Sequence, residues 1–192
     1  MKKLMLAAVM ALVAATAWAE RADSNKPISI TYETFDADDV SQIKTFTGNV
    51  VLTRGTLIMK AEKAVLREDK EGYQSVVLTA APGKLATFRQ KRDGGPDLWV
   101  EGQAERIEYD DRSELVKLFS RAQIRQIDGG TMSNEIDSEF ISYDSRKEQF
   151  VVRNDASGVN KPGKGRGTLI IAPKKPRAPA PAATPEPAAV KP

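Results

Sequence analysis

Residues 45–66 alternate between apolar and polar side chains with a period of two, and this alternation constrains the fold more than any other feature of the sequence. Phe46, Val50 and Leu52 fall on one face of an extended chain, because successive side chains of a β-strand point to opposite sides. Gly55 interrupts the alternation, which then resumes, as a hairpin turn requires. The stretch therefore predicts two strands joined by a tight turn, with one continuously apolar face.

Weak copies of this stretch occur further along the chain. The segment AEKAVLR at 61–67 is followed by AERIEYD at 104–110 and by SEFISYD at 138–144, and the segment at 46–52 has a counterpart, LFSRAQI, at 118–124. Repetition of a strand-turn-strand unit predicts an antiparallel stack of hairpins in one elongated domain. Chance similarity among short amphipathic strands is the alternative explanation.

The rest of the central region is also typical of an all-β fold. Turn residues recur about every 8 to 12 positions, and no long segment has helical periodicity. We expect a first strand at 28–32, a solvated turn at 33–41 and a short final strand at 168–171. The inward parity changes from even to odd positions between residues 98 and 109, which predicts a bulge at Gly102.

The two ends of the chain differ from this central region. Residues 1–19 combine a basic start, an apolar run and an Ala-x-Ala site, which together predict a secretory signal peptide; an uncleaved membrane anchor is the alternative. Residues 20–26 are expected to be a flexible N-terminus and residues 27–172 the folded domain. Residues 173–192, rich in Pro, Ala and Lys, are expected to be a disordered tail.

Composition argues against several classes of function. The formal net charge of +3 falls by two, to +1, without Lys2 and Lys3, and such near-neutrality argues against nucleic acid as a partner. The chain has no Cys and no His, so it has no disulfide and lacks the commonest general base and metal ligand. An enzyme would depend on paired carboxylates such as Glu105 and Asp110. The acids at 33–39 lack the Gly and Glu of a calcium loop. We therefore expect no catalytic site, metal or cofactor.

Six short motifs occur in a set order: Pro27-Ile28-Ser29-Ile30, Phe46-Thr47-Gly48-Asn49-Val50, Gly55-Thr56-Leu57, Ala61-Glu62-Lys63-Ala64-Val65, Ala86-Thr87-Phe88 and Val100-Glu101-Gly102-Gln103-Ala104. Together with the signal peptide, their order and spacing resemble the LptA, or OstA-like, family of periplasmic lipopolysaccharide-transport proteins. The resemblance extends from about residue 27 to residue 172, and the F-T-G-N-V motif is its most specific part. The chain departs from the family at Ser120-Arg121, where a Gly-Asn pair is usual, and in its proline-rich tail.

The resemblance implies an elongated β-jellyroll of antiparallel strands, V-shaped in cross-section, located in the periplasm. It also implies that lipopolysaccharide is carried with its lipid A acyl chains in an apolar interior. Copies would join head to tail as a homo-oligomer and pair with an LptC-like inner-membrane partner and an LptD-like outer-membrane partner. The strand edges expected to make these contacts comprise Pro27, Ile28, Ser29, Ile30, Thr31 and Tyr32 at one end and Phe150, Val151 and Val152 at the other.

Parity along the predicted strands selects the residues of the lipid-binding groove. Ile28, Ile30, Phe88 and Tyr109 match family motifs associated with lipid contact, and for every candidate ordinary core packing is the alternative role. The full set is Ile28, Ile30, Phe46, Val50, Leu52, Leu57, Met59, Leu66, Phe88, Ile107, Tyr109, Val116, Leu118, Ile141, Tyr143 and Phe150.

Four basic residues of the central stretch could meet phosphates of the lipid headgroup. Acids are interspersed among them, so a solvated outer face is the expected role; the four are Lys44, Arg54, Lys60 and Lys63. The alternative to a lipid carrier is a structural adaptor of the cell envelope, which would assemble through strand edges without carrying lipid.

Overall fold

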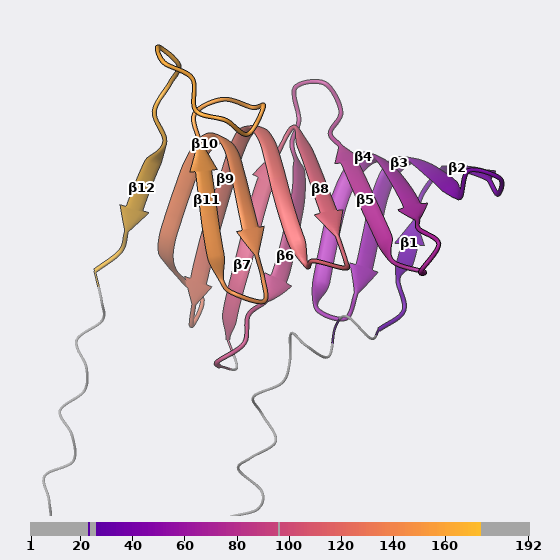
Figure 1. The fold of residues 1–192 in the computed structure, drawn as a ribbon. Helices are drawn as coiled ribbons and strands as arrows, with labels where there is room; N and C mark the ends of the chain where they lie inside the picture. Colours follow the sequence, from indigo (N-terminus) through magenta and orange to yellow (C-terminus); the bar gives the residue numbers. More distant parts are fainter. Residues whose placement is uncertain (1–22, 24–25, 96, 174–192) are drawn as a thin grey trace, which may run out of the picture.

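The computed structural model describes residues 23, 26–95 and 97–173. These residues form one antiparallel sheet of twelve strands, stacked in a row along the long axis of the molecule (Figure 1). The predicted all-β class and the elongated antiparallel jellyroll, V-shaped in cross-section, are confirmed. The predicted signal peptide and almost all of the predicted tail lie outside the described residues. In chain order the strands are β1 Ser29–Thr31, β2 Thr34–Asp38, β3 Ile43–Arg54, β4 Leu57–Glu68, β5 Gln74–Thr79, β6 Ala86–Lys91, β7 Leu98–Ala104, β8 Arg106–Asp110, β9 Leu115–Asp128, β10 Thr131–Asp144, β11 Gln149–Arg153 and β12 Thr168–Ile171.

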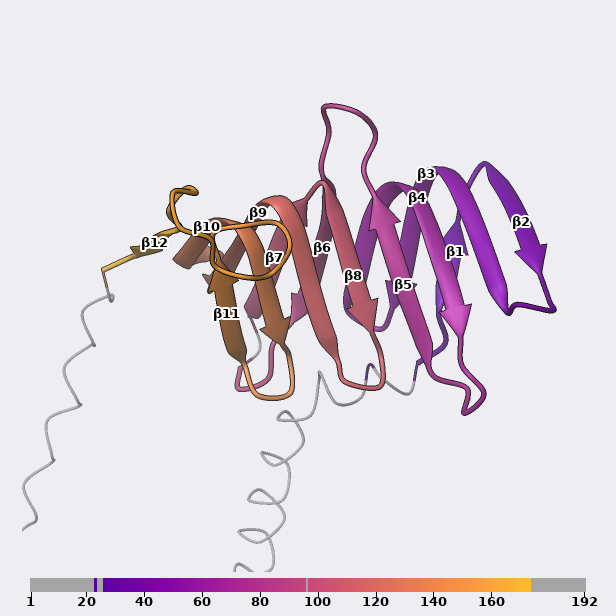
Figure 2. The ribbon, with the colours of Figure 1, turned by 45° about the horizontal axis from the view of Figure 1, so that its top comes forward.

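The four long strands, β3, β4, β9 and β10, each belong to two half-sheets. The first half of β3, residues 43–47, pairs with β2, and the second half, residues 51–53, pairs with β1. In the same way β4 pairs with β5 and β6, β9 with β8 and β7, and β10 with β11 and β12. We call the half-sheet with β2, β5, β8 and β11 wall A, and the half-sheet with β1, β6, β7 and β12 wall B (Figure 2).

The long strands bend where they pass from one wall to the other, and we call this edge of the molecule the spine. In β3, Gly48 and Asn49 have φ values of 84° and 45°, and in β9, Ser120 and Arg121 have φ values of 62° and 52°. The strand pairing also shifts register here, between residues 47 and 50. Consecutive residues in the left-handed region redirect a strand, so the sheet folds over instead of continuing flat.

The repeats seen in the sequence correspond to the spine. The segments 46–52 and 118–124 are the parts of β3 and β9 that pass from wall A to wall B. The segments 61–67, 104–110 and 138–144 each lead from the spine into a strand of wall A. The repeated pattern therefore marks where the chain changes wall.

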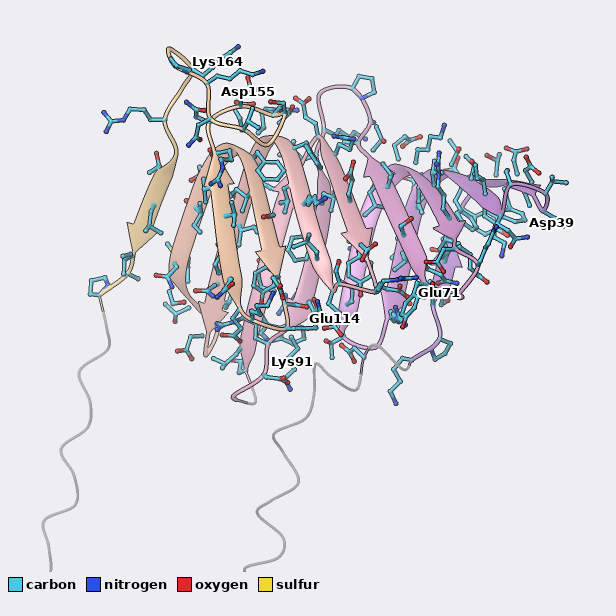
Figure 3. All side chains as sticks on the ribbon, viewed as in Figure 1. Asp39, Glu71, Lys91, Glu114, Asp155 and Lys164 are labelled. Carbon is cyan, nitrogen blue, oxygen red and sulfur yellow. The ribbon has the colours of Figure 1, made fainter. Side chains whose placement is uncertain are left out.

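The opposite edge of the molecule, which we call the mouth, is formed by hairpin turns. Wall A ends there in the turns at 69–73, 111–114 and 145–148, and wall B ends in turns that include residues 55–56 and 92–95. Glu71, Glu114 and Lys91 lie along this edge in Figure 3, whereas Asp155 and Lys164 lie near the spine. Each of these turns joins two strands of the same wall, so the chain crosses between walls at the spine.

Two local expectations were wrong. Residues 34–38 were expected in a solvated turn but form β2, an exposed edge strand that is held by backbone pairing with β3. The strand register continues through Gly102, which pairs with Phe88 and Ile124. The parity changes instead at Glu105, where the chain crosses the spine between β7 and β8.

None of the described residues belongs to a helix long and apolar enough to cross a membrane.

Candidate functional site

The candidate site is the interior between the two walls, where apolar residues line up across neighbouring strands. In wall A, one row runs from Phe46 through Leu78 and Ile107 to Ile141, and a second runs from Leu66 through Val76, Tyr109, Val116 and Tyr143 to Phe150. In wall B, a row runs from Ile30 through Leu52, Met59, Phe88, Gly102 and Ile124 to Ile136. Each row extends along almost the whole row of strands, so the apolar surface is continuous from end to end.

All sixteen predicted groove residues face this interior. Ile28, Ile30 and Phe150 are partly buried against the core, and the other thirteen belong to it. The two walls pack against each other, because most of these side chains have almost no exposed surface. Whether each residue contacts lipid, in addition to packing the core, stays a prediction.

Several interior residues were missed from the sequence. Val76 and Leu78 are fully buried, but Val77 between them is also apolar, so parity was ambiguous in β5. The burial of Ile124 could have been predicted, since it is the last residue of the copy at 118–124 and corresponds to the inward-facing Leu52. The other interior residues outside the predicted set are Ala64, Ala86, Val100, Ala104 and Ala122, whereas Phe140, which is also buried, lies outside this core and packs against Phe119.

Gly102 allows the ring of Phe88 to lie in the interior. A Cβ atom at Gly102 would overlap Cε1 of Phe88 and lie 2.8 Å from Cδ1. The glycine therefore provides space for the aromatic ring opposite it, and does not bend the strand as the sequence had suggested.

The interior becomes polar toward the mouth. In wall B, the row next to the apolar one contains Gln90, Val100, Gln126 and Asn134. Asn134 Nδ2 donates a hydrogen bond of 2.7 Å to Gln126 Oε1. Gln90 is only 6% exposed, and its Oε1 has no hydrogen-bond partner among the described residues. Polar groups thus lie where the space between the walls approaches solvent.

An ion pair joins the walls at the mouth. Arg54, at the end of β3 in wall B, lies 3.1 Å from Asp111 of wall A, and the two side chains are 13% and 10% exposed. Asp111 also accepts the backbone N–H of Gln74 at 2.8 Å, and Arg54 Nε donates to the carbonyl of Lys26 at 3.2 Å. Arg54 was expected on a solvated outer face, and that expectation was wrong.

Tyr109 lies beneath this ion pair. Burial raises the pKa of the Tyr109 hydroxyl to about 12, although the nearby charge of Arg54 acts in the opposite direction. The hydroxyl therefore keeps its proton further into alkaline pH than that of an exposed tyrosine, despite the neighbouring arginine.

A second ion pair crosses the mouth further along the molecule. Arg92, in the turn after β6, lies 2.7 Å from Glu148 of wall A, with side-chain exposures of 15% and 38%. Burial lowers the pKa of Arg92, but its interactions with Glu148 and with Tyr143 outweigh that effect and raise it. Tyr143, like Tyr109, is a buried residue of the wall A row nearest the mouth. Each arginine thus interacts with a buried tyrosine and a carboxylate of the opposite wall.

The other basic candidates lie differently. Lys60 and Lys63 are exposed on the outer surface, as expected, and Lys44 is partly buried near the mouth end of β3. Lys60 also borders a hollow of about 390 Å³ on the outer face of wall B.

The carboxylates considered for catalysis or metal binding have structural partners. Glu105 and Asp110 flank β8, at the spine and the mouth, so they do not share a cleft. Glu105 pairs with Arg121 at 2.8 Å, and Asp110 accepts the backbone N–H of Ser113. In the acidic segment, Asp38 accepts hydrogen bonds from the backbone N–H groups of Val40 and Ser41. Among the described residues no group of acidic side chains is arranged to hold a metal ion.

The strands at the two ends of the stack pair on one side only among the described residues. At the N-terminal end these are β1 and β2, where the rings of Tyr32, Phe35 and Phe46 lie 5.0 to 5.6 Å apart. At the C-terminal end they are β11 and β12, with Val151 facing outward. The residues predicted as partner edges lie in or next to β1 and β11.

Together, these features define a class of protein: an elongated β-jellyroll whose apolar interior, with one polar edge, is the candidate site and whose end strands pair on one side only among the described residues. Residues 29–150 match a family model described as "LptA/(LptD N-terminal domain) LPS transport protein", and the chain belongs to this family.

Individual relatives agree with this assignment. The chain is 31% identical over 173 residues to "Lipopolysaccharide export system protein LptA" of Haemophilus influenzae, covering 90% of this chain and 92% of the relative. It is 32% identical over 133 residues to the LptA of Escherichia coli K12, covering 69% and 70% of the two chains. A solved structure, "Crystal structure of LptH, the LptA homologous periplasmic component of the conserved lipopolysaccharide transport device from Pseudomonas aeruginosa", matches with a TM-score of 0.67 and 25% identity, covering 79% and 99% of the chains.

Proposed function

We propose that this protein is a periplasmic lipopolysaccharide-transport protein, and no enzyme, that shelters lipid A acyl chains between its two walls. The observation that carries the proposal is the set of apolar rows that run along the stack inside both walls. Such rows offer acyl chains a continuous path, whereas an ordinary ligand pocket would be closed at both ends. The names of the relatives support the choice of lipopolysaccharide.

Burial of acyl chains between the walls is energetically favourable. Each methylene group removed from water contributes about 0.8 kcal/mol, so ten groups contribute on the order of 8 kcal/mol before ordering costs. The walls have to separate for the chains to fit, because their side chains are already in contact. An acyl chain replaces those contacts with new apolar ones, so separation does not expose the core to water.

The same proposal assigns the free edges of the end strands to assembly. An edge strand presents unpaired N–H and C=O groups, which a strand of another molecule can complete. Contact between the C-terminal edge of one copy and the N-terminal edge of the next is heterologous and does not close on itself. Head-to-tail copies would then extend the interior toward an LptC-like partner at the inner membrane and an LptD-like partner at the outer membrane.

One observation favours a second candidate function, a structural adaptor that carries no lipid. The interior is closely packed in this structure, as the core of an adaptor would be. Both candidates predict assembly through edges, and only the carrier predicts lipid uptake.

Photo-crosslinking to labelled lipopolysaccharide separates the two candidates. A photoreactive residue at Ile107, which is buried between the walls, should label the lipid, and the same residue at neighbouring Glu108, which faces outward, should not. Phe88 provides a second inward position. Equal labelling at both faces would refute the groove. Oligomers without labelling at any inward position would favour the adaptor.

A further inference from the structure

Two arginines occupy positions where the headgroup of a sheltered lipid would emerge. Arg54 and Arg92 extend from wall B across the mouth, and each interacts with a buried tyrosine of wall A. An amphiphile whose acyl chains lie between the walls keeps its headgroup in water, and the mouth is the edge at which the interior turns polar. The two guanidinium groups therefore lie at the level of the headgroup.

Their present partners are carboxylates, which have much the same geometry toward a guanidinium group as phosphate does. Arginine binds either group through two parallel N–H donors. Asp111 is held in place by the backbone N–H of Gln74. Glu148 lies in a turn, is 38% exposed, and can move into solvent. Arg92 is thus the arginine that can more easily change its partner.

A second observation indicates a ligand at the same place. Gln90 is the inward-facing residue two positions before Arg92, and its Oε1 is a buried acceptor with no donor among the described residues. A buried acceptor without a donor has lost its hydrogen bond to water without a replacement, which is unfavourable. A hydroxyl or amide N–H of a bound headgroup would satisfy it.

We propose that Arg54 and Arg92 bind the phosphates of the lipid headgroup, exchanging Asp111 and Glu148 for them, while Gln90 accepts a hydrogen bond from the same headgroup. The proposal rests on the proposed function, since it requires a lipid between the walls. Arg54 is the last residue of β3 and Arg92 directly follows β6, and these strands flank β4, so the Cα atoms of the two arginines lie roughly two strand spacings, or about 10 Å, apart. That separation suits a headgroup with two phosphates better than a single ion.

The test compares bisphosphorylated lipid A with the same lipid after removal of both phosphates. The wild-type protein should bind the phosphorylated lipid about tenfold more tightly, as expected for a charge-assisted hydrogen bond. Arg92→Gln should abolish most of that preference and leave binding of the dephosphorylated lipid unchanged. Glu148→Gln should strengthen binding of the phosphorylated lipid, because it frees the arginine. Arg54→Gln tests the first arginine in the same way, and Arg92→Lys should restore part of the preference.

A matched control pair lies at the opposite edge. Arg121 and Glu105 form an exposed ion pair at the spine, 2.8 Å apart. Arg121→Gln and Glu105→Gln should leave the binding of both lipids unchanged.

The outcomes separate this inference from the proposed function. If the wild-type protein binds neither lipid, the proposed function fails. If it binds both equally well, or if Arg92→Gln and Glu148→Gln change affinity in the same direction for both lipids, the ion pairs are structural only and the phosphate site is refuted. Competition by inorganic phosphate at concentrations near the lipid's own dissociation constant would show a free-anion site, which would also overturn the assignment to the headgroup.

Discussion

Substitution of Gly102 by alanine should destabilise the fold through one neighbouring ring, that of Phe88. A methyl group at this position would overlap Cε1 and lie 2.8 Å from Cδ1 and 3.0 Å from Cζ. Overpacking of a core typically lowers the free energy of unfolding by about 1 to 3 kcal/mol, and we expect a penalty of that size from the contact with Phe88. Alanine regains about 0.5 to 1 kcal/mol over glycine inside a strand, so the free energy of unfolding should fall by about 1 to 2 kcal/mol.

A double-mutant cycle with Phe88→Val tests the cause. Valine lacks all three of the ring atoms that the new methyl group would meet. Phe88→Val itself should cost about 2 to 4 kcal/mol, because it leaves a cavity. In that background, however, Gly102→Ala should be neutral or stabilising by up to about 1 kcal/mol, which is a coupling of about 1 to 3 kcal/mol.

Urea denaturation followed by far-ultraviolet circular dichroism measures the four free energies of unfolding. Gly165→Ala is the matched control, since a methyl group there would meet nothing within 4 Å and the φ angle is not positive. The same penalty for Gly102→Ala with and without the Phe88 ring would refute the reasoning, because the cost would then come from the backbone.

Three further predictions concern other parts of the molecule. Stability should fall as pH rises from 10.0 toward about 12, since the buried Tyr109 keeps its proton in the folded state after the unfolded chain has lost it; alkaline urea titrations of wild type and Tyr109→Phe should differ in this window. Ser120→Gly should raise the free energy of unfolding by up to about 1 kcal/mol in urea denaturation, because a φ of 62° suits glycine; a decrease would contradict this prediction. Val151→Asp, on the exposed face of β11, should abolish concentration-dependent oligomers in analytical ultracentrifugation with unchanged circular dichroism; oligomers that persist would rule out this edge.

Alternation of side chains was sufficient to predict the strands and the inward-facing residues wherever only one parity is apolar. In β3, Phe46, Val50 and Leu52 are inward on both sides of the spine, because the two residues in the left-handed conformation preserve the parity. The inward-facing residues of β5 could not be predicted in this way, since Val76, Val77 and Leu78 are all apolar and their burial depends on what lies on each face of the strand. The edge strand β2 was missed because it is exposed on both faces and is held mainly by backbone pairing with β3, with a ring contact between Phe35 and Phe46.

The polar part of the site could not have been predicted from local patterns. Arg54 and Asp111 are 57 residues apart in sequence, and Arg92 and Glu148 are 56 apart. Their contacts depend on how the spine sets the angle between the walls, and periodicity within one strand carries no information about that angle. Arg54 was placed outside because acids are interspersed among the basic residues of that stretch, and its partner on the opposite wall could not be inferred from them.

The two walls are connected by the chain at the spine and, among the described residues, only by side-chain contacts elsewhere, which bears on how a lipid could enter without unfolding the protein. Backbone hydrogen bonds lie within each wall, and the chain passes between walls at the spine, so separation of the walls at the mouth would break none of the ladders. It would break side-chain contacts, which acyl chains would replace in the proposed carrier, and the two ion pairs of Arg54 and Arg92, which phosphates would replace in the proposed headgroup site. Partly buried ion pairs suit this role, because a charge left without a partner in the interior is unfavourable, so the walls would separate more readily when a phosphate takes the place of the carboxylate. In the proposed carrier, the lipid would therefore compensate for the interactions that its own insertion disrupts.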